Sequence, residues 1–202
     1  MATGRLIAIE GIDGAGKTTL ARGLVAARPE LVVLREPGGA EVSERIRGLV
    51  ADPELAVHPR AEALLFAAAR AQLVAEVVRP LLDGGRWVVL DRFVDSSLAY
   101  QGAGRGLGVE AVAAINAFGT GGLRADLTLY VRVDPEVGAA RLGGGTGAAL
   151  DRIEQAGAAF FARVVEAYDS LAATRQDYVV LDGAGTPESV LSDALAALKR
   201  LQ

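Results

Sequence analysis

Short apolar runs alternate with longer amphipathic stretches along this chain. Five of the runs are four to eight residues long and rich in Val, Ile and Leu, which is typical of strands buried on both faces of a sheet. The predicted strands are 5–10 (RLIAIE), 31–36 (LVVLRE), 87–91 (WVVLD), 127–134 (LTLYVRVD) and 178–182 (YVVLD).

The stretches between these runs have the spacing of helices. Val42, Ile46 and Leu49, for example, recur at helical intervals. The predicted helices include 17–27, 40–51, 59–82 and 187–201. Alternating strands and helices predict an α/β fold, with a five-stranded parallel sheet and helices on both faces. No internal repeat or linker divides the chain, so we expect one domain over residues 1–202.

Acidic residues mark one end of the predicted sheet. Glu10, Glu36, Asp91 and Asp134 all fall at the carboxyl ends of predicted strands. Ligands of open α/β sheets bind in the crevice beyond those ends. The sequence therefore predicts a ligand site at this edge.

Composition narrows the class of protein. The chain has 202 residues, of which 51% are hydrophobic, enough for one well-formed core. It has no cysteine, which excludes a disulfide framework and a thiolate metal site. The net charge of −4 argues against nucleic acid as the main partner. No apolar run approaches ~18 residues and the first ten residues show no signal-peptide pattern, so we expect a soluble, cytoplasmic protein without membrane contact.

A phosphate-binding motif follows the first predicted strand. The stretch GIDGAGKT has the P-loop pattern, with Gly at its first and sixth positions followed by Lys and Thr, between a strand and a helix. Glycines allow backbone N–H groups to converge on phosphate oxygens, and the helix that follows adds its positive end. The alternative is an ordinary glycine-rich turn with an exposed lysine. The residues expected to bind ATP are Gly11, Ile12, Asp13, Gly14, Ala15, Gly16, Lys17, Thr18 and Thr19.

Two side chains of this motif have chemical roles. Lys17 is expected to reach the β- and γ-phosphates, and the Thr18 hydroxyl is expected to help hold Mg²⁺. The motif indicates a nucleoside triphosphate, but it does not identify the group that receives the phosphoryl.

Three further stretches bear on the acceptor: REPGG from Arg35, AEALLFAAARAQL around Phe66 and Arg70, and DRFVDSSLAYQGAGRG from Asp91. Phe66 and Arg70 are four residues apart and share a helix face. An arginine among Ala and Leu needs a polar partner. Each feature also has a simpler explanation: Phe66 as core, Arg70 paired with Glu62, Asp91–Arg92 as a strand-end ion pair and Tyr100 at a core edge.

Together these stretches resemble the thymidylate kinase family, whose members transfer the γ-phosphoryl of ATP to dTMP. The matching segments occur in the order of the family and span most of the chain: Gly11–Thr19, Arg35–Gly39, Leu64–Leu73, Asp91–Gly106 and Leu150–Gln155. The resemblance implies the P-loop kinase fold, ATP and dTMP as substrates, Mg²⁺ as cofactor and a homodimer.

The resemblance also implies roles in the acceptor pocket. The thymine ring would stack on Phe66, and its edge would meet Arg70 and Gln101. Two serines would line the pocket and one tyrosine would close it: Ser96, Ser97 and Tyr168.

The sugar and phosphate of dTMP would be bound by residues from three stretches. Tyr100 would pack under the deoxyribose and disfavour a 2′-hydroxyl, and Asp13 would accept from the 3′-hydroxyl. The acceptor phosphate would lie near Arg35 and Arg92, and Asp91 would hold Mg²⁺ through water. Glu36, just past the second strand, is also expected to bind the substrate.

A short lid is expected at about 141–152, where family members of this P-loop type carry several arginines. Here the segment reads RLGGGTGAALDR, so only Arg141 and Arg152 flank a glycine run. With Lys17 and Arg92, these two arginines are the predicted catalytic cations. The alternative is that Arg152 pairs with Asp151 or Glu154, and that Arg92 and Lys17 suffice.

The expected reaction needs no strong general base. A phosphate monoester loses its second proton near pH ~6, so the nucleophile is already ionised at neutral pH. The single histidine, His58, is therefore expected in a surface loop. Positioning and cations are expected to provide catalysis. The alternative functions are a kinase of another monophosphate, such as dUMP, CMP or GMP, and a non-catalytic ATP-binding regulatory module.

Overall fold

A five-stranded parallel sheet forms the centre of the molecule. The computed structural model describes residues 4–143 and 151–201. The strand order is β2-β3-β1-β4-β5, and every neighbouring pair is parallel. The predicted sheet is thus confirmed. Its strands are β1 Arg5–Glu10, β2 Val32–Arg35, β3 Trp87–Asp91, β4 Leu127–Arg132 and β5 Tyr178–Asp182.

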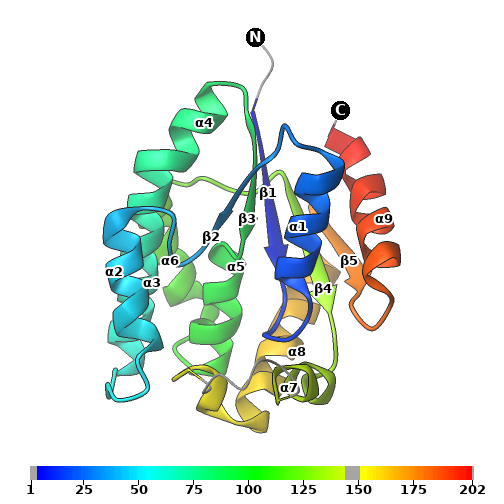
Figure 1. The fold of residues 1–202 in the computed structure, drawn as a ribbon. Coiled ribbons are helices and arrows are strands. Elements are labelled where there is room, and N and C mark those ends of the chain that lie inside the picture. The colour runs from blue at the N-terminus through cyan, green and yellow to red at the C-terminus, as the bar shows by residue number, and fades with distance from the viewer. Residues whose placement is uncertain (1–3, 144–150, 202) are drawn as a thin grey trace.

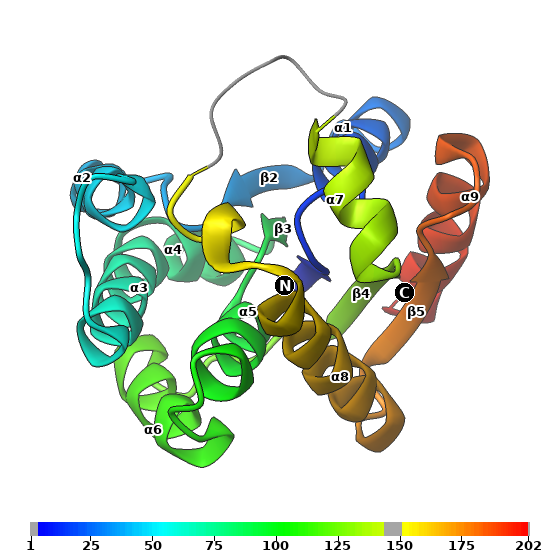
Figure 2. The ribbon, with the colours of Figure 1, turned by 90° about the horizontal axis from the view of Figure 1, so that it is seen from below.

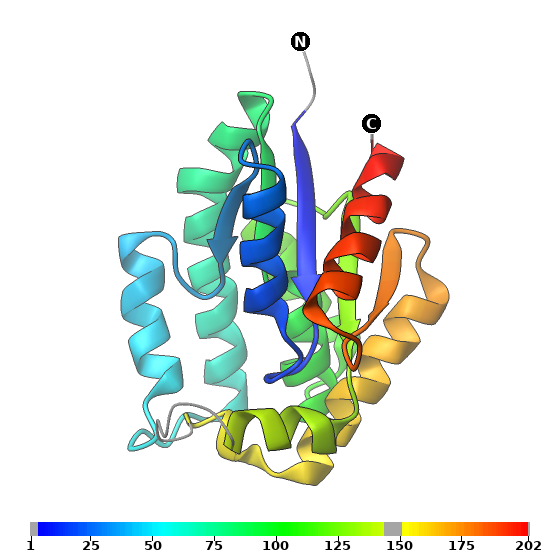
Figure 3. The same cartoon turned by 45° about the vertical axis from the view of Figure 1, so that its right-hand side comes forward.

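Helices cover both faces of this sheet (Figures 1 and 2). On one face, α1 (Lys17–Ala27) and α9 (Pro187–Leu198) lie side by side (Figure 3). The other face carries α3 Pro59–Leu73, α5 Val94–Ser97, α6 Val109–Thr120 and α8 Ala158–Thr174. α2 (Glu41–Ala51) packs against α3, and α7 (Pro135–Gly143) crosses the carboxyl end of the sheet.

The central strand is apolar because both of its faces are covered. Leu6, Ile7, Ala8 and Ile9 of β1 are all buried. The larger core cluster joins β1, β4 and β5 to α1, α8 and α9, and a smaller one joins β1 and β3 to the end of α3.

The predicted helix 59–82 has three parts in the structure. α3 is followed by a π-helical turn, Val74–Val78, and then by α4 (Arg79–Asp83). Pro80 has no N–H to donate to the fourth residue before it, so the regular ladder cannot continue there. At the other end, exposed His58 accepts a hydrogen bond from the backbone N–H of Arg60 and caps α3.

The remaining elements are short. A π-helical turn, Leu98–Gly104, follows α5, and two 3₁₀ turns cover Glu154–Ala156 and Lys199–Leu201. Of the predicted lid at 141–152, residues 144–150 lie outside the described residues. Among the described helices, none is long and apolar enough to cross a membrane.

The sheet changes winding direction at β1, which lies between β3 and β4. In Figure 1 the carboxyl ends of the strands point downward, toward α7. The P-loop leaves β1 at this end, and the Asp91–Arg92 pair lies at the end of β3. The fold therefore brings the two main motifs together at a topological switch point, where ligands of such sheets bind.

Candidate active site

The P-loop is held open by left-handed glycines. Gly11, Gly14 and Gly16 have φ values of 141°, 78° and 101°, which disfavour residues with a Cβ. Gly14 also packs closely on α7: a Cβ there would lie 2.2 Å from the carbonyl oxygen of Gly138. The loop backbone therefore has both the conformation and the close packing that glycine allows.

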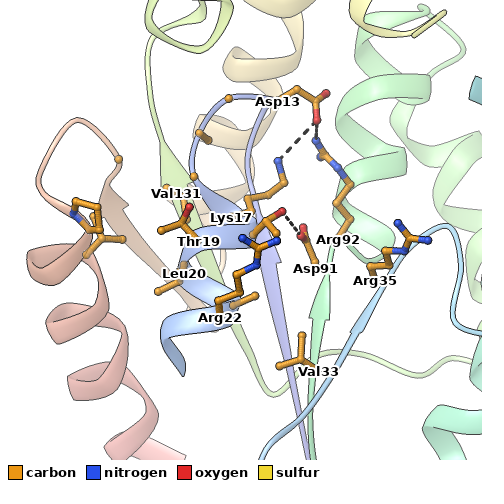
Figure 4. A pocket seen from close by; sticks show the side chains of 18 of the residues that line it. Asp13, Lys17, Thr19, Leu20, Arg22, Val33, Arg35, Asp91, Arg92 and Val131 are labelled. Carbon is orange, nitrogen blue, oxygen red and sulfur yellow. Dashed lines mark hydrogen bonds and ion pairs between the residues drawn. The ribbon is translucent and has the colours of Figure 1, made fainter. Parts of the chain in front are cut away.

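Lys17 lies at the start of α1, folded back over this loop. Its Nζ donates to the carbonyl oxygen of Ile12 at 2.8 Å and lies 3.9 Å from Asp13 Oδ1. Burial, with the nearby charge of Arg92, lowers the pKa of Lys17 to about 8. The lysine is therefore positioned where phosphates would meet the loop (Figure 4).

Arg92 connects β3 to the P-loop. It donates to Asp13 Oδ1 at 2.5 Å and to the carbonyl oxygen of Gly11 at 2.8 Å. Burial alone would raise the pKa of Asp13, but attraction to Arg92 and Lys17 outweighs it and lowers this pKa to about 2. The Tyr100 hydroxyl donates to the other oxygen of Asp13 at 3.1 Å. Asp13 is thus an ionised acceptor between the P-loop and β3.

The backbone of Arg92 is strained. Its φ is 74°, the one positive value recorded for a non-glycine among the described residues. Such a conformation costs of order 1–3 kcal/mol and persists where the surroundings hold it, often at functional sites. Here the Arg92 N–H donates to the carbonyl oxygen of Ile9, and its side chain is held by Asp13.

Thr18 and Asp91 form an oxygen pair beside the loop. The Thr18 hydroxyl donates to Asp91 Oδ2 at 3.1 Å. A hydroxyl and a carboxylate oxygen suit Mg²⁺, which binds few protein ligands and keeps water and phosphate oxygens. No group of three or more acidic, His or Cys ligands occurs among the described residues. The donor set therefore fits an ion shared with a phosphate substrate rather than an all-protein metal site.

Two cavities meet at this edge of the sheet. The larger, of about 1210 Å³, is lined by the P-loop and α1 together with Arg141 and Asp91. The smaller, of about 130 Å³, is lined by aromatic and polar side chains that include Phe66, Arg70 and Gln101. Four residues line both cavities: Asp13, Glu36, Arg47 and Arg92. A group passing from one cavity to the other would move between two arginines and two carboxylates.

Arg70 is the centre of a buried network in the smaller cavity. Its Nε donates to Glu36 Oε2 at 2.6 Å, and its Nη2 donates to the carbonyl oxygen of Phe93 at 2.9 Å. Its Nη1 donates to Ser97 Oγ and to Asn116 Oδ1. Burial raises the pKa of Glu36 to about 7 despite Arg70. The cavity is thus lined by an arginine whose side chain is fixed on several sides.

Comparison with known proteins places the chain in a family. Residues 9–194 match the family model described as thymidylate kinase. A thymidylate kinase of Latilactobacillus sakei subsp. sakei (strain 23K) is 46% identical, covering 96% of this chain and 94% of that protein. The chain belongs to the thymidylate kinase family. A thymidylate kinase of Deinococcus radiodurans is 45% identical, with 98% of both chains covered.

Most residues singled out by the family resemblance lie together. Phe66 is half-buried and faces the smaller cavity, so it is not ordinary core. The predicted residues that line this cavity are Asp13, Glu36, Phe66, Arg70, Arg92, Ser96, Ser97, Tyr100 and Gln101. The alternative pairing of Arg70 with Glu62 is wrong, because Arg70 pairs with Glu36.

Two residues predicted from the family pattern lie elsewhere. Tyr168 is fully buried, stacks on Tyr130 and donates to Glu10, so it lies behind the pocket instead of closing it. Arg152 pairs with Glu62 at 2.7 Å, rather than with Asp151 or Glu154, and is not among the described residues lining the larger cavity.

Arg35 lines the larger cavity but is half-exposed and forms an ion pair with Glu44. Arg141 lies in α7, lines the same cavity and donates to the carbonyl oxygen of Gly14 at 3.4 Å. Of the two lid arginines, Arg141 is the one near the P-loop.

Several residues of the site were not predicted from the sequence. Arg47 of α2 lines both cavities and donates to the carbonyl oxygen of Pro37 at 3.1 Å. The smaller cavity is also lined by Pro37, Val50, Ala51, Asp151 and Ile153. Arg47 could have been suspected from the sequence, because it lies next to Ile46 on the predicted helix that directly follows the REPGG stretch. No local sequence pattern indicated that the other residues line the cavity.

Proposed function

We propose that this protein is a dTMP kinase, which transfers the γ-phosphoryl of ATP to dTMP and releases dTDP and ADP. The observation that supports this most directly is the junction of the two cavities at Asp13 and Arg92. A triphosphate on the P-loop and a monophosphate in the smaller cavity would meet there. Membership of the thymidylate kinase family supports the choice of acceptor.

The smaller cavity suits a pyrimidine nucleotide. Phe66 offers an aromatic face for stacking, and Arg70 and Gln101 offer polar atoms for the edge of a base. Tyr100 is held by Asp13 beside the base region, where its ring would lie under a deoxyribose. Asp13 would accept from the 3′-hydroxyl, since Arg92 keeps it ionised.

Catalysis follows from charge and position. An ionised oxygen of the acceptor phosphate forms the new bond to the γ-phosphorus, while the bond from the γ-phosphorus to the bridging oxygen breaks and its electrons leave with ADP. Lys17, Arg92 and Arg141 line the larger cavity and would stabilise the transferring group, and Arg47 would add charge on the acceptor side. Mg²⁺ beside Thr18 and Asp91 would neutralise phosphate charge.

We further propose that the protein works in the cytoplasm. We also propose that it forms a homodimer through the helices on one side of the sheet. Large apolar side chains are exposed there: Leu64 of α3 is 57% exposed and Phe118 of α6 is 92% exposed. α3 and α6 are in contact, so these residues lie on neighbouring helices. Sedimentation of wild type and Phe118→Asp tests this assembly, and a monomeric wild type at micromolar concentration would contradict it.

The activity is tested by ADP release with dTMP, dUMP, CMP, GMP and AMP as acceptors. We expect dTMP to give the highest kcat/KM and Lys17→Ala to abolish turnover without unfolding the protein. A preference for another monophosphate would identify a different kinase. ADP formation that no acceptor accelerates would instead indicate a regulatory ATP-binding module.

A further inference from the structure

Glu62 is a buried carboxylate for which the proposed chemistry has no role. It lies in the first turn of α3 and has no exposed surface. Its Oε1 accepts from Gln101 Nε2 at 2.9 Å and from Arg105 Nε at 3.2 Å. Its Oε2 accepts from Arg105 Nη2 at 3.0 Å and from Arg152 Nη1 at 2.7 Å. Glu62 thus connects Gln101 in the smaller cavity to two arginines outside it.

This contact fixes the orientation of the Gln101 amide. An ionised carboxylate only accepts hydrogen bonds, so the NH₂ group of Gln101 must face Glu62. The carbonyl oxygen of the same amide is then the end that points away from Glu62. Because Gln101 lines the smaller cavity, this oxygen is the atom available to a ligand there.

Glu62 is held in its ionised form. Burial alone would raise its pKa, but hydrogen bonds from Arg105, Gln101 and Arg152 outweigh burial and lower it. Arg152 is itself anchored, since its Nε donates to the carbonyl oxygen of Val50 and its backbone N–H to that of Ala51. The carboxylate therefore stays an acceptor, and its position is fixed from two sides.

We propose that Glu62 is a positioning residue for base selection: by holding the Gln101 NH₂ group, it presents the Gln101 carbonyl to bases that carry a proton on N3. Thymine and uracil have an N3–H donor, whereas N3 of cytosine is an acceptor and would face the Gln101 oxygen without a proton between them. Glu62 would thus act through Gln101 to favour keto pyrimidines. The inference rests on the proposed binding of a pyrimidine monophosphate in the smaller cavity.

The substitution Glu62→Gln tests this at atomic level. One of the two side-chain oxygens becomes an NH₂ group. The oxygen that remains is favoured on the side of Arg152 and Arg105 Nη2, because both of these groups can only donate. On the other side the Gln101 amide can turn over to accept, and the Arg105 Nε contact is the longest of the four at 3.2 Å. The new NH₂ group would then face Gln101, whose amide must turn over to accept from it. Gln101 would now present its own NH₂ group to the cavity, which suits N3 of cytosine.

We expect opposite changes for two acceptors. In Glu62→Gln, the affinity for dTMP should fall, because its N3–H would face the NH₂ group of Gln101, and that for dCMP should rise, because its N3 would gain a donor. The ratio of their dissociation constants should change about tenfold or more, the size expected when a buried hydrogen bond is exchanged for two facing donors. Both affinities are measured by isothermal titration and both kcat/KM values by ADP release. General loosening of the pocket would weaken both ligands together, so it would not mimic this result.

The matched control is Arg105→Met. It removes two hydrogen bonds from Glu62 and keeps an apolar stem beside the Phe160 ring, over which Arg105 lies. The oxygen facing Gln101 loses its hydrogen bond from Arg105 Nε but keeps the one from Gln101, so the ratio of dTMP to dCMP affinity should stay within about twofold of wild type. If Glu62→Gln does not fold, Glu62→Asp serves instead. The Asp side chain is one methylene shorter, so its carboxylate would not reach the NH₂ group of Gln101. The ratio of dTMP affinity to dCMP affinity should therefore fall.

An unchanged ratio in a folded Glu62 variant would overturn the inference. An equal loss of both affinities would do so too, because it would reduce Glu62 to a structural role. These outcomes are separable from failure of the proposed function. If wild type does not phosphorylate dTMP, the function is wrong; if wild type does so and the variant keeps its selectivity, only the role of Glu62 is wrong.

Discussion

Arg92 Nη2 and Asp13 Oδ1 form an ion pair of 2.5 Å that joins the end of β3 to the loop after β1. Both residues line both cavities, so the pair lies where the two substrates would meet. Asp13 also attracts Lys17, at 3.9 Å. The carboxylate therefore positions two cations that the proposed transfer requires.

The first prediction concerns pH and the charge of Lys17. Its pKa is lowered to about 8 by burial and by Arg92, so the free protein loses this charge as the pH rises through about 8. We expect ATP affinity, measured by titration calorimetry, to fall between pH 7 and pH 9. Lys17→Ala should bind ATP weakly and with little pH dependence over this range.

The same lowered pKa has a defined effect on stability. Between about pH 8 and the usual value of 10.5, the unfolded chain holds the Lys17 proton more tightly than the folded protein does. The contribution of Lys17 to stability should therefore improve as the pH rises through this window. For the first effect, an ATP affinity that stays constant from pH 7 to pH 9 would contradict the predicted role of the Lys17 charge in ATP binding.

A second prediction separates the two lid arginines. Arg141 is exposed in the larger cavity, whereas Arg152 is partly buried and forms an ion pair with the buried carboxylate of Glu62. Arg141→Ala should lower kcat at least about tenfold, or ~1.4 kcal/mol, with little change in melting temperature. Arg152→Ala should instead destabilise the fold by about 1–3 kcal/mol, because it removes a charged partner from a buried carboxylate. Thermal melts and kcat for both variants test this, and equal losses of kcat in two stable variants would refute it.

The third prediction concerns the buried pair of Arg70 and Glu36. Arg70→Met should destabilise the protein by about 3–5 kcal/mol, since it leaves Glu36 buried without its cation. Adding Glu36→Gln should restore part of this stability but not dTMP affinity, because the base edge still lacks Arg70. Chemical denaturation and dTMP titration distinguish the two effects. Recovery of dTMP binding in the double variant would show that Arg70 acts only through Glu36.

The fourth prediction concerns the packing of the P-loop on α7. Gly14→Ala combines a φ of 78° with a clash against the Gly138 carbonyl, so it should displace α7 and weaken ATP binding more than tenfold. Gly106→Ala is the matched control: its φ is 71°, but nothing lies within 4 Å of the added Cβ. It should cost only about 1–2 kcal/mol of backbone strain and leave ATP affinity unchanged. Equal ATP binding by the two variants would argue against the contact with α7.

The sequence by itself determined the features that depend on local patterns. Strand β1 reads as four consecutive apolar residues because neighbouring strands and helices bury both of its faces. The P-loop was recognisable because its glycines serve a backbone conformation that few other residues adopt. Phe66 and Arg70 could be placed on one face from their spacing alone.

Only the tertiary structure decided which distant side chains meet. Arg70 could have paired with Glu62, eight residues away on the same helix, yet it pairs with Glu36 from the end of β2, while Glu62 receives Arg105 and Arg152. Buried charges must find partners, but the sequence does not say which ones, because the choice depends on how helices and strands pack. For the same reason Tyr168, expected at the mouth of the pocket, lies buried behind it against Tyr130.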